Sequence, residues 1–150
     1  MEAHEPVEIL IVEDNAYDLE MTLRGFRQAH LVNHIHVARD GEEALDFLFC
    51  RGAHAARCPD QRPRVILLDL KLPKVDGLEV LAQVKAHPTL CTVPVVMMTS
   101  SQEQSDLVRS YQLGVNSYVV KPVQFEAFVK AVQELGLYWM LLNQPSASPS

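Results

Sequence analysis

Short apolar runs alternate with amphipathic segments along this chain, and the alternation limits its fold more than any other feature. The apolar runs have the length of buried strands, and the segments that follow them have the period of helices. We expect strands at 8–12, 34–37, 65–68, 95–98 and 117–120, and helices from 16 onward, at 41–49, 78–86 and 104–113, and from 124 onward. Repeated strand–helix units of this kind predict an α/β fold with a parallel sheet.

The length of the chain suits one such domain. Its 150 residues fall within the usual size of a single domain, and we assign residues 1–143 to it, with an extended C-terminal helix. The segment 144–150 is rich in serine and proline and has nothing to pack in a core, so we expect a disordered tail. Residues 50–64 carry turn formers without a periodic pattern, which indicates a surface loop whose role the sequence leaves open.

The charge balance and the cysteines disfavour several classes of protein. Acidic side chains number 19 against 13 Lys and Arg, a formal net charge of −6, whereas nucleic-acid binding needs clustered basic residues. The apolar stretch Leu137–Leu142 is far shorter than the ~20 residues that cross a bilayer, and the N-terminus is unlike a signal peptide. Three cysteines, an odd count, favour reduced thiols in the cytoplasm. Zinc binding by Cys50, His54 and Cys58 is disfavoured by their spacing.

Polar side chains follow four of the predicted strands. They are Glu13 and Asp14 after the first strand, Asp69 after the third, Thr99 after the fourth and Lys121 after the fifth. Because ligands bind outside the carboxyl ends of parallel strands, we expect these groups to form one site. Neighbouring carboxylates repel one another unless a cation joins them, and Mg²⁺ takes carboxylates, waters and phosphate oxygens. The sequence therefore predicts Mg²⁺ together with a phosphate group.

Asp69 is the candidate nucleophile of that site. It lies on the central strand, and a carboxylate can attack a phosphoryl group and form an aspartyl phosphate while Glu13 and Asp14 hold the metal. Lys121 and the Thr99 hydroxyl are suited to stabilise the charge of a phosphoryl group in transfer.

Other phosphate-binding classes share this architecture. A dinucleotide-binding Rossmann domain needs Gly-x-Gly-x-x-Gly after the first strand, but residues 13–18 of this chain contain no glycine. The glycine-rich motif of a P-loop is also absent from the sequence. Phosphatases of the haloacid-dehalogenase type place a second Asp two residues after the nucleophile, and here that position is Lys71. A Mg²⁺-dependent phosphohydrolase with an aspartate nucleophile is thereby disfavoured, but it stays open as the alternative function.

The order of these motifs resembles the receiver domain of two-component response regulators. The resemblance spans roughly residues 7–135 and rests on the following motifs: Glu13-Asp14, Asp69, Leu72 to Gly77, Thr99-Ser100-Ser101, Tyr118 and Lys121-Pro122. The loop at 50–64, the stretch 67–74 and Tyr138-Trp139 are similar to the small regulators paired with bacterial and cyanobacterial phytochromes.

The resemblance implies a flavodoxin-like, doubly wound five-stranded parallel sheet with strand order 2-1-3-4-5 and helices on both faces. It also implies a phosphoacceptor and its metal ligands. Asp69 would accept the phosphoryl group, and Asp14, Asp69 and the Lys71 backbone carbonyl would ligate Mg²⁺, with Glu13 acting through water.

The remaining motif residues would contact phosphate or transmit its presence. Lys121, Thr99 and the Ser100 backbone N–H would contact the phosphoryl oxygens. Tyr118 resembles the switch aromatic that turns inward when Thr99 shifts, the alternative being a half-buried strand residue. The bond between Lys121 and the following proline is expected to be cis.

By the same resemblance, the chain is a signalling domain that catalyses only its own phosphorylation and dephosphorylation. Its phosphate donor would be a histidine kinase, with a bacteriophytochrome as the candidate. The phosphorylated surface would act on another protein or pass phosphate to a histidine phosphotransfer protein.

The apolar C-terminal segment predicts a homodimer. Leu137–Leu142 is apolar on every side just where a receiver core should be complete, and Tyr138, Trp139, Leu141 and Leu142 would form the interface. In the alternative, Gly136 turns the chain and the segment folds back on its own domain.

Overall fold

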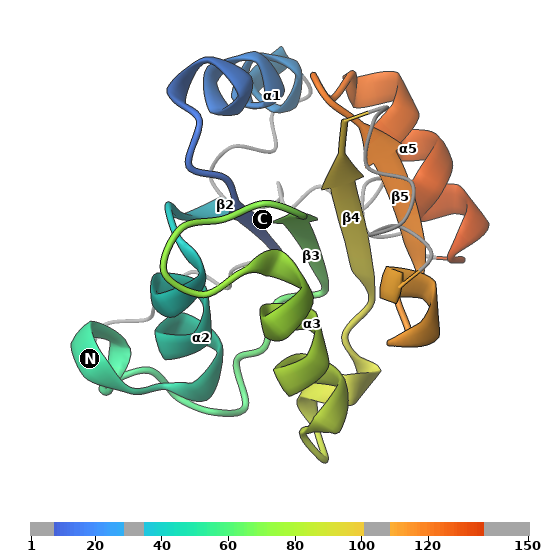
Figure 1. Ribbon diagram of the computed structural model, residues 1–150. Helices are drawn as coiled ribbons and strands as arrows, with labels where there is room; N and C mark the ends of the chain where they lie inside the picture. The colour runs from blue at the N-terminus through green and yellow to red at the C-terminus, as the bar shows by residue number, and fades with distance from the viewer. Residues whose placement is uncertain (1–7, 29–34, 101–108, 137–150) are drawn as a thin grey trace, which may run out of the picture.

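The computed structural model describes residues 8–28, 35–100 and 109–136. Within them, five strands form one parallel sheet in the order β2-β1-β3-β4-β5, which confirms the expected fold (Figure 1). The strands are β1 (Ile9–Val12), β2 (Ile35–Ala38), β3 (Val65–Asp69), β4 (Val95–Thr99) and β5 (Ser117–Val120). The strand order reverses between β1 and β3, so the carboxyl ends of these two strands lie at the switch point where open α/β sheets bind ligands.

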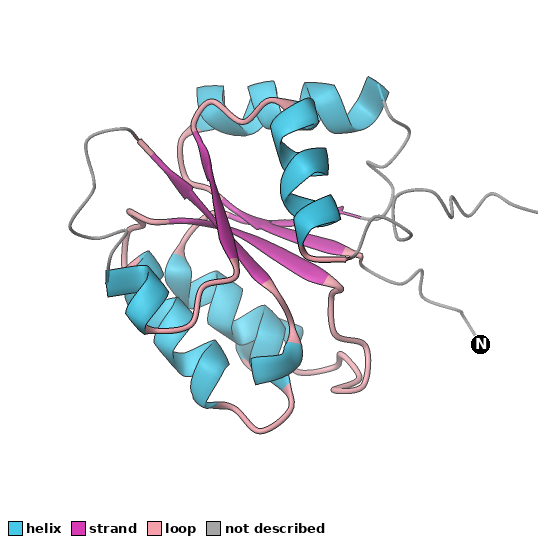
Figure 2. Cartoon of the chain, turned by 90° about the vertical axis from the view of Figure 1, so that its right-hand side faces the viewer, coloured by secondary structure: helices cyan, strands magenta, loops and turns pink. Residues whose placement is uncertain are grey.

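Helices cover both faces of the sheet (Figure 2). One face carries α1 (Ala16–Gln28) and α5 (Phe125–Glu134), and the other carries α2 (Gly41–Phe49) and α3 (Gly77–Ala86). Two 3-10 helices, η2 (Gly52–His54) and η3 (Leu90–Thr92), lie in the connections. Of the helix predicted at 104–113, the described part is helical at 109–112. In the described ranges, no helix has both the length and the apolar character needed to span a membrane.

The side chains of β1 show how both layers form. Ile9 and Ile11 pack with α1 and α5, whereas Leu10 and Val12 pack with α2 and α3, and all four are buried. A strand covered on both faces needs apolar residues at every position, so it is read in sequence as an uninterrupted run.

Two strands extend one residue beyond their apolar runs. The sequence predicted that β3 and β4 end at Leu68 and Met98, but they end at Asp69 and Thr99. The backbone explains the difference: Asp69 pairs with Met98, and the Lys121 N–H donates to the Thr99 carbonyl at 2.9 Å. The hydrogen-bond ladder therefore holds two predicted site residues directly at the edge of the sheet. β2 likewise continues beyond its predicted end, to Ala38.

The loop at 50–64 packs against α2. Cys50 ends that helix in the left-handed conformation, with φ 56°, and η2 follows it. The Arg57 guanidinium lies 3.7 Å from the centroid of the Phe47 ring and donates to the Phe47 carbonyl. The loop is at the surface, as predicted, but these contacts give it a defined position that its irregular sequence did not indicate.

The last described helix ends before the apolar C-terminal segment. α5 ends at Glu134, and Gly136 adopts φ 76°, a left-handed conformation in which glycine is favoured. Residues 137–150 lie outside the described residues, so the extended C-terminal helix and the disordered tail stay predictions.

Candidate functional site

Three carboxylates meet at the carboxyl ends of β1 and β3. Glu13 and Asp14 follow β1 directly, Asp69 is the last residue of β3, and the two strands are neighbours in register. One oxygen of each carboxylate lies within 4.8 Å of the others. Glu13 and Asp69 are only 1% and 2% exposed, whereas Asp14 is exposed. The structure thus brings together the acidic groups that the sequence predicted at one site.

Lys121 reaches into this acidic cluster from the end of β5. Its Nζ lies 3.0 Å from Asp69 Oδ2, 3.5 Å from Glu13 Oε1 and 3.5 Å from Asp18 Oδ2. The peptide bond that follows Lys121 is cis, as the family resemblance predicted. One ammonium group therefore faces three carboxylates.

Asp18 is the member of this group that the sequence analysis missed as a site residue. It lies in the first turn of α1, where its N–H donates to Asn15 Oδ1 at 2.8 Å. Its place in the first turn of the helix that follows Glu13 and Asp14 was a signal that it could also face the site.

Burial gives the carboxylates unusual proton affinities. Burial and, to a smaller extent, the negative charge of Asp69 together raise the pKa of Glu13 to about 8. Burial likewise raises the pKa of Asp69, although Glu13 and Lys121 partly oppose the shift. Burial acts to lower the pKa of Lys121, but the negative charge of Asp69 and the other carboxylates outweighs it, so that pKa is raised. The ammonium alone thus leaves the buried carboxylates short of positive charge.

The donor atoms of the cluster fit a hard divalent cation. Glu13 Oε1 is buried and accepts no hydrogen bond from the described part of the chain, although Lys121 Nζ lies 3.5 Å away. Its other oxygen accepts from the Asn15 N–H at 3.1 Å. A buried carboxylate oxygen in need of a partner, beside two further carboxylates, is the chemistry that Mg²⁺ satisfies.

The Asp69 carboxylate is held at both oxygens. Oδ1 accepts from the Lys71 N–H at 3.2 Å, and Oδ2 accepts from Lys121 Nζ at 3.0 Å. The loop between β3 and α3 adds a steric constraint, because a Cβ at Gly77 would lie 2.2 Å from the Asp69 carbonyl oxygen. Asp76 caps the helix that begins at Gly77, accepting from the Leu78 N–H at 3.4 Å. This close packing of the loop fixes the backbone that carries Asp69.

The predicted phosphate contacts lie at the end of the neighbouring strand. Thr99 is 3% exposed, and its hydroxyl donates to the Ser100 carbonyl at 3.0 Å. Ser101 lies outside the described residues. The roles of Thr99, of the Ser100 N–H and of the Lys71 carbonyl stay predictions.

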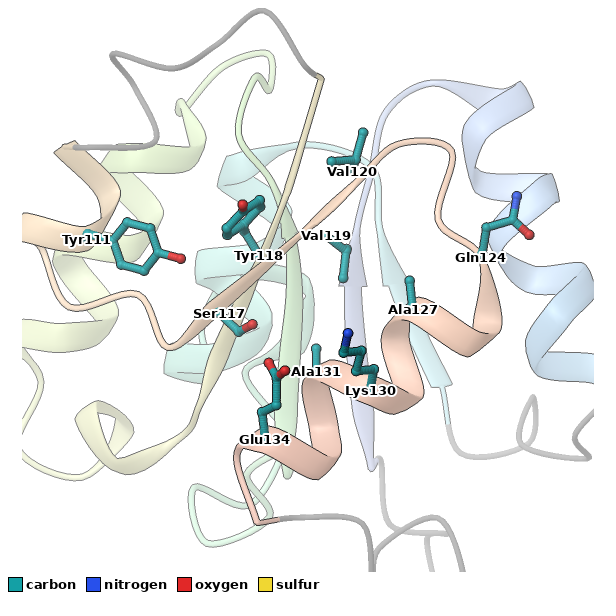
Figure 3. Close-up of a pocket in the computed structure, with 10 residues that line it drawn as sticks. All are labelled: Tyr111, Ser117, Tyr118, Val119, Val120, Gln124, Ala127, Lys130, Ala131 and Glu134. Carbon is teal, nitrogen blue, oxygen red and sulfur yellow. The ribbon is translucent and has the colours of Figure 1, made fainter.

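Tyr118, the predicted switch residue, lies on the outer side of β5. It is 42% exposed, and its ring meets that of Tyr111 edge-on, with centroids 6.1 Å apart. Both side chains border a pocket that continues along α5 to Lys130 and Glu134 (Figure 3). The Tyr118 ring forms part of the wall of this pocket, so an inward turn of the ring would change the shape of the pocket.

The predicted dimer residues Tyr138, Trp139, Leu141 and Leu142 all lie outside the described residues. The homodimer therefore stays a prediction.

Comparison with known proteins adds sequence relatives that match nearly the whole chain. Residues 9–133 match the family model of the response regulator receiver domain. The Probable methanogenesis regulatory protein FilR2 of Methanothrix harundinacea is 41% identical over 144 residues, which cover 96% of this chain and 90% of FilR2. Response regulator Rcp1 of Synechocystis is 37% identical over 139 residues, which cover 93% of this chain and 92% of Rcp1.

Solved structures match the fold over the same length. The bacteriophytochrome response regulator AtBRR has a TM-score of 0.82 and 57% identity, covering 94% of this chain and 100% of AtBRR. The Mn²⁺-bound form of Rcp1 has a TM-score of 0.72 and 35% identity, covering 97% of this chain and 100% of Rcp1.

Proposed function

The chain belongs to the response regulator receiver family, and from this premise we propose that Asp69 accepts a phosphoryl group from a histidine kinase. One observation carries the assignment: the Asp69 carboxylate is buried at the switch point of the sheet, with one oxygen on a backbone N–H and the other on Lys121 Nζ. A nucleophile held in this way keeps its orientation toward an incoming phosphoryl group.

The transfer exchanges one bond to phosphorus for another. An oxygen of Asp69 forms the new O–P bond as the N–P bond to the kinase imidazole breaks, and the electron pair of that bond returns to the imidazole. Lys121 and Thr99 stabilise the charge on the phosphoryl oxygens, and the Ser100 N–H donates to one of them. Burial of Asp69 and Thr99 excludes bulk water from the reacting carboxylate.

We assign Glu13, Asp14, Asp69 and the Lys71 carbonyl as the residues that hold Mg²⁺, with Glu13 acting through water. Glu13 Oε1, a buried oxygen that accepts no hydrogen bond from the described residues, supports the assignment, and so does Rcp1, a relative whose structure was solved in a Mn²⁺-bound form. Bound Mg²⁺ supplies positive charge that neutralises the carboxylates and the phosphoryl oxygens.

Phosphorylation would change the surface around Tyr118. A shift of Thr99 toward the phosphoryl group opens room into which Tyr118 can turn, and the pocket between β5 and α5 changes shape with it. A partner protein or a histidine phosphotransfer protein would recognise that change. We propose that phosphorylation and partner recognition take place in the cytoplasm, which agrees with the three free cysteines.

A bacteriophytochrome is the kinase that we propose as donor, because AtBRR, 57% identical, is a bacteriophytochrome response regulator. Phosphotransfer from a panel of histidine kinases, with a phytochrome kinase assayed in its red and far-red states, tests this. We expect transfer from the phytochrome kinase to be faster than from the others and to differ between its two states. Equal rates from all kinases would contradict the pairing but leave the phosphoacceptor assignment untouched.

Incubation with acetyl phosphate and Mg²⁺, followed by intact mass spectrometry, separates the signalling function from the phosphohydrolase alternative. We expect one phosphoryl group per chain, lost in Asp69→Asn and retained in Glu134→Gln, which changes an exposed carboxylate on α5. Multiple turnover of generic phosphomonoesters without a stable phosphoprotein would instead support the hydrolase.

A further inference from the structure

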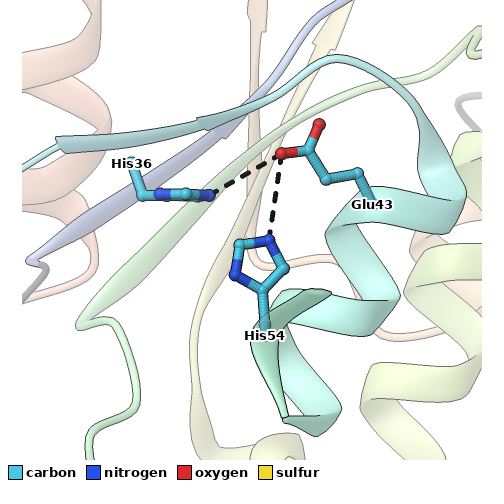
Figure 4. Close-up of side chains that lie close together, drawn as sticks. All are labelled: His36, Glu43 and His54. Carbon is cyan, nitrogen blue, oxygen red and sulfur yellow. Dashed lines mark ion pairs between the residues drawn. The ribbon is translucent and has the colours of Figure 1, made fainter. Parts of the chain in front are cut away.

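A second group of metal-binding side chains lies at the β2 edge of the molecule, apart from the acidic site. It consists of His36 on β2, Glu43 on α2 and His54 in η2 (Figure 4). His36 Nε2 and His54 Nε2 each lie 3.9 Å from Glu43 Oε2, and one ligand atom from each residue falls within 4.8 Å of the others. In the sequence His54 lies between Cys50 and Cys58, whereas the fold brings it to His36 and Glu43.

The ligand atoms are oriented by contacts that leave them free for a metal. His36 Nε2 is buried and has no hydrogen-bond partner in the described part of the chain. The His36 ring stacks on Phe47, with centroids 4.1 Å apart and planes 11° from parallel, and His54 meets the same ring edge-on at 5.3 Å. Glu43 Oε1 accepts from the Arg39 N–H at 3.0 Å, so Oε2 is the oxygen turned toward both imidazoles.

We propose that His36, Glu43 and His54 form a Zn²⁺ site. Two imidazoles and a carboxylate are ligands that Zn²⁺ takes, with a water in the fourth position of a tetrahedral site. Bond lengths of about 2.0–2.2 Å place two tetrahedral ligands roughly 3.3–3.6 Å apart, so the 3.9 Å pairs need only a small contraction. All three side chains are partly exposed, which gives the ion a path to the site.

Arg57 is a cation whose charge interacts with His36. Its guanidinium is engaged by the carbonyls of Phe47 and Gln61 and by the face of the Phe47 ring. These contacts hold the guanidinium in place. Among the described contacts it donates no hydrogen bond to Glu43, the carboxylate of the cluster.

The bound ion would tie the loop at 50–64 to the sheet. His54 is the ligand from the loop, while His36 and Glu43 belong to the strand and helix that the loop packs against. A bond from each of these three elements to one ion stabilises the folded arrangement relative to the unfolded chain. The site thereby gives this loop a structural role at a distance from phosphorylation chemistry.

Equilibrium dialysis of the whole chain against Zn²⁺, with saturating Mg²⁺ present to compete at the acidic site, tests the proposal. We expect one Zn²⁺ per chain, a higher midpoint of thermal unfolding with Zn²⁺, and about tenfold or greater loss of affinity in His36→Gln, His54→Ala and Glu43→Gln. Glu43→Gln keeps an acceptor for the Arg39 N–H, so it removes the carboxylate charge with little change to the helix start.

Cys58→Ser is the matched control, because Cys58 is a free, exposed thiol of the same loop that lies outside the proposed site. It should bind Zn²⁺ like the wild type, and every variant should still accept one phosphoryl group from acetyl phosphate. The proposal is overturned if the wild type binds no Zn²⁺ at about 100 µM, or if the three variants bind it as tightly as the wild type. In either case the cluster is a set of histidine–glutamate ion pairs only.

Discussion

Lys121 is the residue on which the charge balance of the acidic site depends. Its ammonium faces Asp69, Glu13 and Asp18. A divalent cation bound at Glu13 and Asp69 would share these carboxylates with it. We expect Lys121→Ala to bind Mg²⁺ as tightly as the wild type or more tightly, because a neighbouring positive charge is removed. Phosphorylation should then no longer change the surroundings of Tyr118. Calorimetric titration with Mg²⁺ checks the first outcome, with Lys130→Ala as control, and loss of Mg²⁺ binding would show that the assigned roles are wrong.

The raised pKa of Glu13 predicts how stability depends on pH without Mg²⁺. Because the folded value of about 8 exceeds the ordinary 4.5, the folded protein binds more protons than the unfolded chain between these pH values. The stabilisation is complete below pH 4.5 and is lost as the pH rises through about 8. We expect the free energy of unfolding, measured with urea in EDTA, to fall less steeply over this range in Glu13→Gln or in saturating Mg²⁺.

Comparing Glu13→Gln with the wild type removes the contribution of other titrating groups, because those groups are present in both proteins. Burial lowers the pKa of His36, which gives the opposite slope near its ordinary value of 6.5, but this contribution is the same in both proteins. An unchanged slope in Glu13→Gln would mean that another group holds the proton.

Residues that follow strands could be located from the sequence, and residues brought in by packing could not. Glu13, Asp69 and Lys121 converge because parallel strands present their carboxyl ends at one edge of the sheet. The approach of His54 to His36 depends instead on a left-handed residue and a 3-10 turn in an irregular loop. No spacing rule in the sequence encodes that contact.

At the scale of elements, α2 begins with a cap that the structure makes explicit. Asp40 Oδ1 accepts from the Glu43 N–H at 2.8 Å and so satisfies one of the free N–H groups at the helix start. Asp40→Ala should lower the free energy of unfolding by about 1 kcal/mol. Urea denaturation measures the loss, with the exposed loop variant Asp60→Ala as control. Equal stabilities of the two variants would show that the cap contributes nothing beyond its charge.

Element positions were predictable to within a residue or so because each strand is mostly apolar and most helices have an apolar stripe. The helix over 41–49 and the strand over 117–120 agree with the sequence prediction. The predicted ends of β3 and β4 were one residue short because each strand ends in a polar residue, Asp69 or Thr99, which hydrophobicity does not assign to a strand. The loop at 50–64 has no period from which a position could be predicted.

At the scale of the whole molecule, the apolar sequence of residues 137–142 predicts an interface between two chains. We expect a homodimer in which residues 137–142 pack on the partner, because a contiguous apolar patch in water is unfavourable. Sedimentation of the full chain should give a dimer at tens of micromolar, and monomers for a chain truncated after Leu135 and for Trp139→Glu combined with Leu142→Glu. If all three sediment as monomers, phosphorylated or not, the segment packs within its own chain.

The central claim is that Asp69, and no other carboxylate of the cluster, carries the phosphoryl group. Borohydride reduction of the phosphorylated protein converts the acyl phosphate carbon to an alcohol, so peptide mass spectrometry can locate the modified aspartate. We predict homoserine at position 69 only, formed in the presence of Mg²⁺ and absent when Mg²⁺ is chelated before phosphorylation. A reduced side chain at position 13, 14 or 18, or at none of these carboxylates, would contradict the account.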